Sequence, residues 1–275
     1  MRRMPIQLPH IEQGDSTGIP VILLHGYSDS HRSYEPLLAH LPRDLRATAL
    51  TTRGHGDAPR PHGENAYTPG TLADDVVAHL DDRDIEAAVI VGHSAGSYTA
   101  QQLAVDHPDR VRGLVLMGAF RSTRDNPAIA PLLAAVDELT DPVDPEFVRE
   151  FQLSTLAQPV PPAFLDMVCA ESRKLPARVW QQVLRELADA PVPTETATIE
   201  APTLVLWGDR DDICLLDEQA RLTAAIPGSE LVVHSGLGHA LHWEQPHRAA
   251  ADIAAFARRA VSPRAPRRPR SVAAR

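Results

Sequence analysis

The sequence lacks the features that mark secreted and membrane proteins. Its 275 residues contain only two cysteines, Cys169 and Cys214, too few for the disulfide framework of a small secreted domain. No apolar run is long enough to cross a bilayer, and prolines and polar residues between Pro5 and His10 interrupt any signal-peptide core. We therefore expect a soluble cytoplasmic protein.

The chain also lacks an excess of positive charge. Its 27 basic residues are outnumbered by 36 acidic ones, which gives a formal net charge of −9. Seven of the arginines lie from Arg258 onward, where no acidic residue occurs, so the rest of the chain is more acidic still. Because binding of phosphate groups needs a basic surface, this distribution argues against a nucleic-acid partner. We expect no membrane partner either, and the sequence leaves the oligomeric state open.

Internal repeats are absent too, and the composition is that of an ordinary globular protein, with 43% hydrophobic and 23% charged residues. Apolar segments of strand length alternate with segments that favour helix, which predicts a parallel sheet wrapped by helices, with a ligand site at the carboxyl ends of the strands. Residues 5–18 predict a weak hairpin at the edge. The expected strands are 20–24, 45–50, 87–91, 111–118, 201–208 and 229–234, and the expected helices are 33–41, 71–80, 95–107, 217–226 and 246–259.

The stretch Gly92-His93-Ser94-Ala95-Gly96 joins the strand 87–91 to the helix behind it. Turning a strand into a helix within so few residues forces the central residue into a strained backbone conformation, and glycines lack the β-carbons that would collide there. Ser94 is then expected on a tight tip at the end of the strand, as a nucleophile. A serine that only caps a helix would not explain both glycines.

On this motif, and on three further landmarks in the expected order, the chain resembles the α/β-hydrolase superfamily over about residues 10–260. The resemblance implies an α/β fold with a mostly parallel, doubly wound sheet and a helical cap insertion. Cap-bearing serine esterases and cofactor-free haloperoxidase-like members are the most similar groups. Epoxide hydrolases and haloalkane dehalogenases fit less well, because they carry an aspartate where Ser94 stands.

The first further landmark is His25-Gly26-Tyr27, at the end of the strand 20–24. The resemblance implies that Gly26 lets the backbone turn so that the Tyr27 N–H faces the nucleophile. The Ala95 N–H, at the start of the following helix, would be the second donor of an oxyanion hole. For His25 itself we expect a structural role, in hydrogen bonds to the local backbone.

The second further landmark is the acidic loop after Gly208, where three carboxylates compete for one role. The superfamily's spacing of G-x-x-D selects Asp211 as the acid of the triad. Asp209 is expected to cap or pair with the local backbone. Asp212 remains a possible substitute for Asp211.

The third further landmark is the glycine-rich loop after the last strand, in which Gly238 precedes His239. Its resemblance to the superfamily's histidine loop implies that His239 is the base, in the chain order Ser94, Asp211, His239. His234 and His242 are expected to pack or to form local hydrogen bonds.

Residues 121–198 break the alternation of strands and helices with clustered prolines and amphipathic pieces at 145–154, 163–171 and 177–188. We expect a helical cap over a core of residues 1–120 and 199–260, and an Arg- and Pro-rich, disordered tail at 261–275. Five apolar residues of the cap are candidates to bind substrate, although packing of the cap is the simpler role for each: Phe147, Phe151, Phe164, Met167 and Trp180.

Together these landmarks predict a serine hydrolase that uses no metal and no organic cofactor. It would cleave a carboxylic ester or lactone with an apolar moiety through an acyl-serine intermediate. The same residues could serve a C–C bond hydrolase or a perhydrolase, because a fold does not decide its chemistry. A ligand-binding or signalling protein that keeps the triad but turns over slowly is an alternative of another class.

Overall fold

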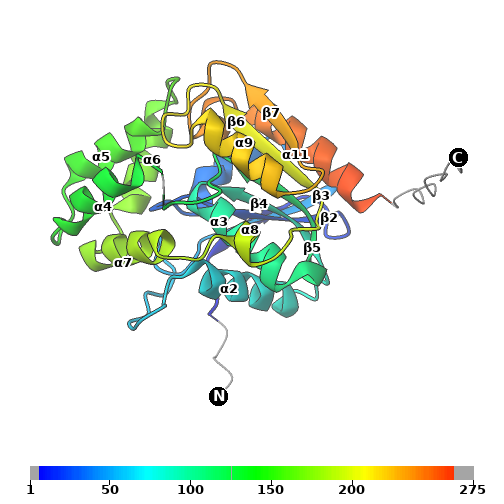
Figure 1. Cartoon of the computed structure of the whole chain (residues 1–275), viewed down its shortest axis with the longest axis horizontal. Coiled ribbons are helices and arrows are strands. Elements are labelled where there is room, and N and C mark those ends of the chain that lie inside the picture. Colours follow the sequence, from blue (N-terminus) through cyan, green and yellow to red (C-terminus); the bar gives the residue numbers. More distant parts are fainter. Residues whose placement is uncertain (1–5, 125, 263–275) are drawn as a thin grey trace, which may run out of the picture.

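A computed structural model describes residues 6–124 and 126–262, and in this part of the chain seven strands form one sheet (Figure 1). The strands follow the order β1-β3-β2-β4-β5-β6-β7, with β1 antiparallel to β3 and all other neighbours parallel. This arrangement confirms the predicted fold class. The strands are β1 (His10–Gln13), β2 (Ile19–Leu24), β3 (Leu45–Leu50), β4 (Ala88–His93), β5 (Val111–Met117), β6 (Thr203–Gly208) and β7 (Glu230–His234).

The predicted hairpin over residues 5–18 is wrong. Its described residues contain the strand β1 alone, and β1 pairs with β3. The chain turns at Gly14, whose φ of +92° suits a residue without a β-carbon, and then enters β2. Because β3 lies between β1 and β2, the two segments around the turn never become neighbours in the sheet.

Helices follow the strands at nearly the predicted positions. The predicted helix 33–41 is split into a short 3₁₀ helix and α1. Pro36 has no N–H that could donate to the carbonyl of Arg32, as a continuous α-helix would require. No helix in the described part of the chain is long and apolar enough to span a membrane. The helices outside the segment between β5 and β6 are η1 (His31–Tyr34), α1 (Glu35–Leu38), α2 (Pro69–Asp82), α3 (Ala95–Asp106), η2 (Pro108–Arg110), α9 (Leu216–Ala225), α10 (Leu241–Glu244) and α11 (Pro246–Val261).

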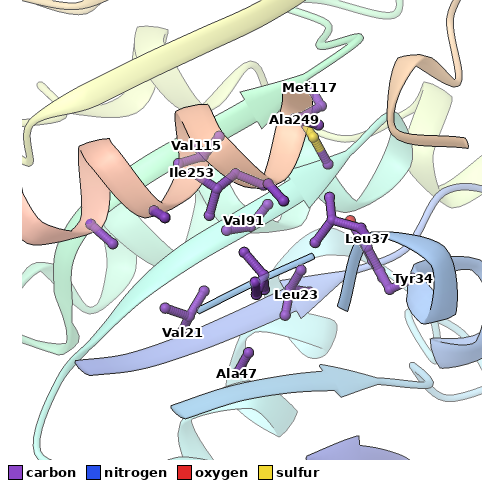
Figure 2. Close-up of a cluster of buried hydrophobic side chains, with 14 of the residues drawn as sticks. Val21, Leu23, Tyr34, Leu37, Ala47, Val91, Val115, Met117, Ala249 and Ile253 are labelled. Atoms are coloured by element: carbon purple, nitrogen blue, oxygen red, sulfur yellow. The ribbon is translucent and has the colours of Figure 1, made fainter. Parts of the chain in front are cut away.

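The sheet is buried between two layers of helices. Successive residues of a strand point to opposite faces, so Val21 and Leu23 of β2 pack toward α1 and α11, whereas Ile22 and Leu24 pack toward α2, α3 and α9. Figure 2 shows the first of these clusters, in which Val21 and Leu23 lie below Ile253 of α11. With both faces covered, substrates can approach the sheet only at its ends.

The segment between β5 and β6, residues 121–198, is called here the helical insertion, since its described residues form helices and no strand. Figure 1 shows its four longer helices gathered at one side of the molecule. The three predicted helical pieces are present, but α4 is new, because its almost wholly apolar sequence shows no helical period. The helices are α4 (Ile129–Asp137), α5 (Pro145–Ser154), α6 (Pro162–Ser172), α7 (Ala177–Ala188) and α8 (Pro193–Thr196).

At the C-terminus, α11 runs two residues beyond the predicted helix, to Val261. The disordered tail was predicted over residues 261–275, and its first residue is wrong because Val261 still belongs to α11. Residues 263–275 lie outside the described residues.

Candidate active site

Ser94 stands on the sharp turn between β4 and α3. Its φ of 51° and ψ of −121° place it in a backbone region that L-residues rarely occupy. A β-carbon on Gly92 would lie 2.6 Å from the Ser97 Cα, and one on Gly96 would lie 2.5 Å from the His25 carbonyl oxygen. Both distances are far below van der Waals contact, so the turn requires glycine at both positions.

His239 and Asp211 form a buried pair beside this turn. The Nδ1 of His239 lies 2.9 Å from Asp211 Oδ2, and both residues are 3% exposed. The other Asp211 oxygen accepts the backbone N–H groups of Ile213 and Cys214, at 2.9 and 2.8 Å. Because an ionised carboxylate only accepts, Nδ1 carries the proton, and Nε2 of the neutral ring is left as a base.

The two other carboxylates of the acidic loop do not face His239. Asp209 accepts hydrogen bonds from the Gly236 N–H at 2.6 Å and the Ser235 hydroxyl at 2.9 Å. The Gly236 bond is the larger cause of a lowered pKa of the Asp209 carboxyl. Asp212 is exposed. Of the three carboxylates, Asp211 is the one bonded to His239, and its role as the acid of the triad stays a prediction.

The two other histidines of the last loop are held elsewhere. His234 Nε2 lies 2.8 Å from Asp252 Oδ2 on α11, away from Ser94. His242 is fully buried, its ring stacks near Tyr34 and His93, and neither of its nitrogens has a partner among the described residues. Burial lowers the pKa of His242 to about 3, so the ring is neutral near pH 7.

The two backbone amides expected to form an oxyanion hole border the same cavity as Ser94. Among the described residues, neither the Tyr27 N–H nor the Ala95 N–H has a hydrogen-bond acceptor. Unpaired amides are rare inside proteins, so such a pair beside the Ser94 hydroxyl has the chemistry to bind an oxygen atom. The Tyr27 side chain points away, and its hydroxyl donates to the Trp180 carbonyl at 2.6 Å.

A cavity of about 150 Å³ connects these groups. Ser94, His239, Gly26, Tyr27 and Ala95 line one side of it. The opposite side is mostly apolar and is contributed by both the core and the helical insertion. Its larger apolar residues are Phe120, Ile129, Leu132, Phe151, Leu184 and Trp243.

Of the five candidate substrate-binding residues of the insertion, only Phe151 lines this cavity. Trp180 is fully buried, with its ring 5.1 Å from that of Tyr27 and 5.8 Å from that of Phe147. Phe164 and Met167 pack in a separate cluster against Trp243 of the core. Four of the five therefore pack the insertion onto itself or onto the core, and do not reach the cavity.

A sequence profile described as the alpha/beta hydrolase family matches residues 21–253. The chain belongs to this family. It is 28% identical to the pimeloyl-[acyl-carrier protein] methyl ester esterase of Neisseria meningitidis serogroup B over 232 residues, which cover 80% of this chain and 85% of the relative. It is also 28% identical, over 243 residues and 82% and 81% of the two chains, to the 2-hydroxy-6-oxononadienedioate/2-hydroxy-6-oxononatrienedioate hydrolase of Cupriavidus pinatubonensis.

Among solved structures, the α/β hydrolase is similar to a thermophilic esterase from Thermogutta terrifontis. The TM-score is 0.80 at 25% identity, and the match covers 93% of this chain and 94% of the esterase. The family and these relatives confirm the prediction that the chain is a hydrolase.

The α/β hydrolase brings one set of metal-ligand types together, in Asp211, Cys214 and His239, whose ligand atoms lie within 4.8 Å of one another. The hydrogen bond between Asp211 and His239 occupies one atom of each. The Cys214 thiol donates to the Gly118 carbonyl at 3.3 Å, and burial raises its pKa well above the usual value. Since metal ions bind the thiolate, this protonated thiol makes a poor ligand.

Five polar residues of the hydrolase's cavity were not predicted from the sequence: Asp29, His93, Gln152, Ser154 and Thr155. Asp29 follows Tyr27 by two positions, and Gln152 lies on α5; both are buried and both line the cavity. The sequence does contain a signal for Asp29, because an acidic residue follows closely on the end of a buried strand. Gln152 carries no such signal, since its contact with Asp29 spans 123 positions.

Proposed function

We propose that this α/β hydrolase cleaves a carboxylic ester or lactone through an acyl intermediate on Ser94. The observation that supports this most directly is a cavity lined by Ser94, by His239 with Asp211 bonded behind it, and by the residues of two unpaired backbone amides. Nucleophile, base and oxyanion donors are the set that acyl transfer needs.

In the first half of the reaction, Ser94 Oγ attacks the carbonyl carbon of the substrate while its proton passes to His239 Nε2. Asp211 holds the imidazole by Nδ1 and stabilises the imidazolium without taking its proton. The negative charge that develops on the carbonyl oxygen is stabilised by the N–H groups of Tyr27 and Ala95. The loss of one such donor in another hydrolase costs about 10²–10³ in kcat.

When the tetrahedral intermediate collapses, the bond to the alcohol oxygen breaks and His239 gives its proton to that oxygen. In the second half, a water molecule attacks the acyl carbon and His239 Nε2 takes a proton from it. The second collapse releases the carboxylic acid and returns the proton to Ser94 Oγ. No redox partner or other reagent is needed for this cycle.

We propose further that the helical insertion, residues 121–198, is a cap on a core of residues 1–120 and 199–260 that decides which acyl or alcohol groups fit. Phe151, Leu132 and Leu184 supply apolar surface to the cavity. The apolar lining favours a small-molecule substrate with an apolar moiety.

Hydrolysis of a C–C bond next to a carbonyl is a second candidate. The observation that favours it is the relative named as a 2-hydroxy-6-oxononadienedioate hydrolase, which is as similar to this chain as the methyl ester esterase. Perhydrolysis by the same residues, in which hydrogen peroxide replaces water as the attacking group, is tested by adding peroxide to the same assay.

The test is a turnover measurement with a series of p-nitrophenyl esters of rising acyl length, after labelling with a fluorophosphonate probe. We expect covalent labelling at Ser94, sustained turnover, and loss of both in the Ser94→Ala variant. A burst without further turnover would support a slow ligand-binding protein instead. No release of product from any ester, but cleavage of a vinylogous β-diketone, would favour the C–C hydrolase.

A further inference from the structure

One corner of the otherwise apolar cavity carries polar groups that the proposed ester chemistry does not use. Asp29 is 3% exposed and lines the cavity. Its Oδ1 accepts a hydrogen bond from Gln152 Nε2 at 3.1 Å. A buried carboxyl without an arginine or lysine partner is costly, so its presence beside Ser94 needs a reason.

The carboxyl of Asp29 is fixed in place by a network between the core and the insertion. Gln152 Nε2 also lies 2.9 Å from Ser172 Oγ of α6 and 3.3 Å from Ser28 Oγ. All four side chains in this network are buried. The Asp29 carboxyl therefore cannot turn away to solvent without breaking its hydrogen bond with Gln152 of α5, which α6 holds in turn through Ser172.

A second acceptor points to the same place. His93 Nε2 donates to the His239 carbonyl at 3.1 Å, so Nδ1 of the neutral ring holds a lone pair. This Nδ1 is buried and has no partner among the described residues. A β-carbon on Gly26 would lie 2.9 Å from His93 Nδ1 and 3.1 Å from Asp29 Oδ2, so the two acceptors, called here the acceptor pair, face one point.

The acceptor pair has spare capacity for a hydrogen-bond donor. A carboxylate offers about four lone-pair sites, and Gln152 and the Gly26 backbone satisfy only part of them. Burial raises the pKa of Asp29 to about 7, which shows how poorly the charged form is compensated. A donor from the substrate would supply the missing bond.

The position of the acceptor pair indicates which part of the substrate it meets. Gly26 directly precedes Tyr27, the proposed oxyanion donor, and His93 directly precedes Ser94, the proposed nucleophile. Asp29 and His93 line the same cavity as Tyr27 and Ser94, so the acceptor pair lies beside the place of the reacting carbonyl. A separate polar pocket shares His239 with the cavity and is lined by Arg210, Asp212 and Gly236. We assign the leaving alcohol to this polar pocket and the acyl group to the cavity that holds the acceptor pair.

We propose that Asp29 and His93 form a specificity subsite that binds a hydroxyl group on the α or β carbon of the acyl chain. This inference rests on the ester hydrolysis proposed above. An apolar pocket discriminates weakly between a hydroxyl and a methyl group, but buried acceptors left unpaired reject the methyl analogue. We expect the subsite to favour the hydroxyl by about 10- to 100-fold in kcat/KM.

The experiment compares esters that differ only by a hydroxyl in place of a methyl group: phenyl lactate with phenyl isobutyrate, and phenyl β-hydroxybutyrate with phenyl isovalerate. The measured quantity is the ratio of kcat/KM within each pair, in the wild type and in Asp29→Asn. The variant keeps the shape but puts an N–H where Oδ2 was, so the ratio should fall by about 10-fold or more. Comparing the two proteins cancels the intrinsic reactivity of the esters.

The matched control is Asp57→Asn, which removes a carboxylate that is exposed and pairs with Lys174 at 2.7 Å. Its ratio should equal that of the wild type. Equal ratios in the wild type and in Asp29→Asn would overturn the proposal. The acceptor pair would then bind water and no substrate hydroxyl. A preference seen only with ethylene glycol esters over propyl esters would overturn the acyl placement.

A second readout needs no variant. The ratio for one ester pair cancels every pH effect on the reaction steps that both esters share, so its pH dependence reports on the subsite. We expect the ratio to fall as the pH drops through about 7, where Asp29 takes up a proton. The titratable groups that interact electrostatically with Asp29 are His239, Tyr34 and Cys169, and His93 lies with Asp29 beside Gly26.

A ratio that stays flat with pH would contradict the subsite even if Asp29→Asn does not fold. Failure of the ester hydrolysis itself is distinguishable. In that case the methyl-substituted esters would not turn over and Ser94 would not be labelled. Turnover of both esters with equal ratios would contradict the subsite alone.

Discussion

The two sides of the cavity are built in different ways. On the sheet side, the groups proposed to react are held by backbone bonds: the Ser94 N–H bonds to the Met117 carbonyl at 3.0 Å, and two backbone amides hold Asp211. The helical insertion gives the cavity mostly side chains, such as Phe151 and Leu184. Side chains can be exchanged without moving a strand, so the reaction and its selectivity should be separable by mutation.

Removing the proposed nucleophile should have the largest effect. Ser94→Ala is expected to lower kcat by about 10⁶, as removal of the serine does in another triad hydrolase. The melting temperature should hardly change, because alanine keeps the backbone of the turn and removes a single oxygen. Assays on p-nitrophenyl esters and thermal melts check this. Substantial activity left in a pure preparation would show that the sheet side does not supply the nucleophile.

Asp211→Asn should come next, with a loss of about 10⁴ in kcat, because an amide can donate to Nδ1 and so favour the wrong tautomer of His239. The neighbouring Asp212→Asn is the matched control and should change kcat only modestly, since Asp212 is exposed. Steady-state kinetics of both variants measure the two losses in kcat. If Asp212→Asn were the more damaging change, the acid would lie one residue later.

On the insertion side, two aromatic residues should behave in opposite ways. Phe151→Ala should change the ratio of kcat/KM for long and short acyl esters by about 10- to 200-fold, because Phe151 lines the cavity. Trp180→Ala should leave that ratio alone and cost about 3–5 kcal/mol of stability, because the indole is fully buried outside the cavity. Kinetics and denaturant unfolding separate the two. An equal effect of Phe151→Ala on both esters would mean that the insertion does not set selectivity.

The last prediction concerns the stability of the fold in acid. All 13 histidines lie outside the insertion, and burial lowers the pKa of His55 to about 4 and that of His242 to about 3. Below pH 6.5 these two histidines bind protons in the unfolded chain, whereas in the folded protein they stay neutral until the pH approaches their lowered pKa values. Stability should therefore fall as the pH drops from 6.5 toward 3, at up to about 1.4 kcal/mol per pH unit for each such group.

His242→Phe removes one of these groups and keeps a ring in its place. The variant should lose less melting temperature between neutral and acid pH than the wild type does. The exposed His62 provides the control, because His62→Gln removes no buried group and should leave the acid sensitivity as it is. An acid sensitivity of His242→Phe equal to that of the wild type would contradict this explanation.

Prediction from the sequence succeeded best where the backbone conformation at a position requires a particular type of residue. Gly92 and Gly96 reveal the turn at Ser94, because no other residue fits there. The alternation of strands and helices predicted the sheet, which the structure and the family confirm. The roles of Ser94, Asp211 and His239 stay predictions until the variants are assayed.

What the sequence did not predict depends on contacts between distant segments. The lining of the cavity by Ile129 and Leu132 follows from how α4 lies over the sheet ends, and nothing local in α4 fixes that. The bond between Asp29 and Gln152 likewise joins positions that only the folded chain brings together. Apolar residues such as Trp180 look alike in sequence whether they pack a helix or face a substrate.

The bond from the Tyr27 hydroxyl to the Trp180 carbonyl has a consequence for engineering. By sequence, Tyr27 belongs to the core, but its side chain is packed into the insertion. A graft of another hydrolase's insertion onto this core would leave the Tyr27 ring and the Asp29 carboxyl without their partners. The unit to transplant is therefore the insertion together with the loop Tyr27-Ser28-Asp29, two pieces of chain that would have to be exchanged as one.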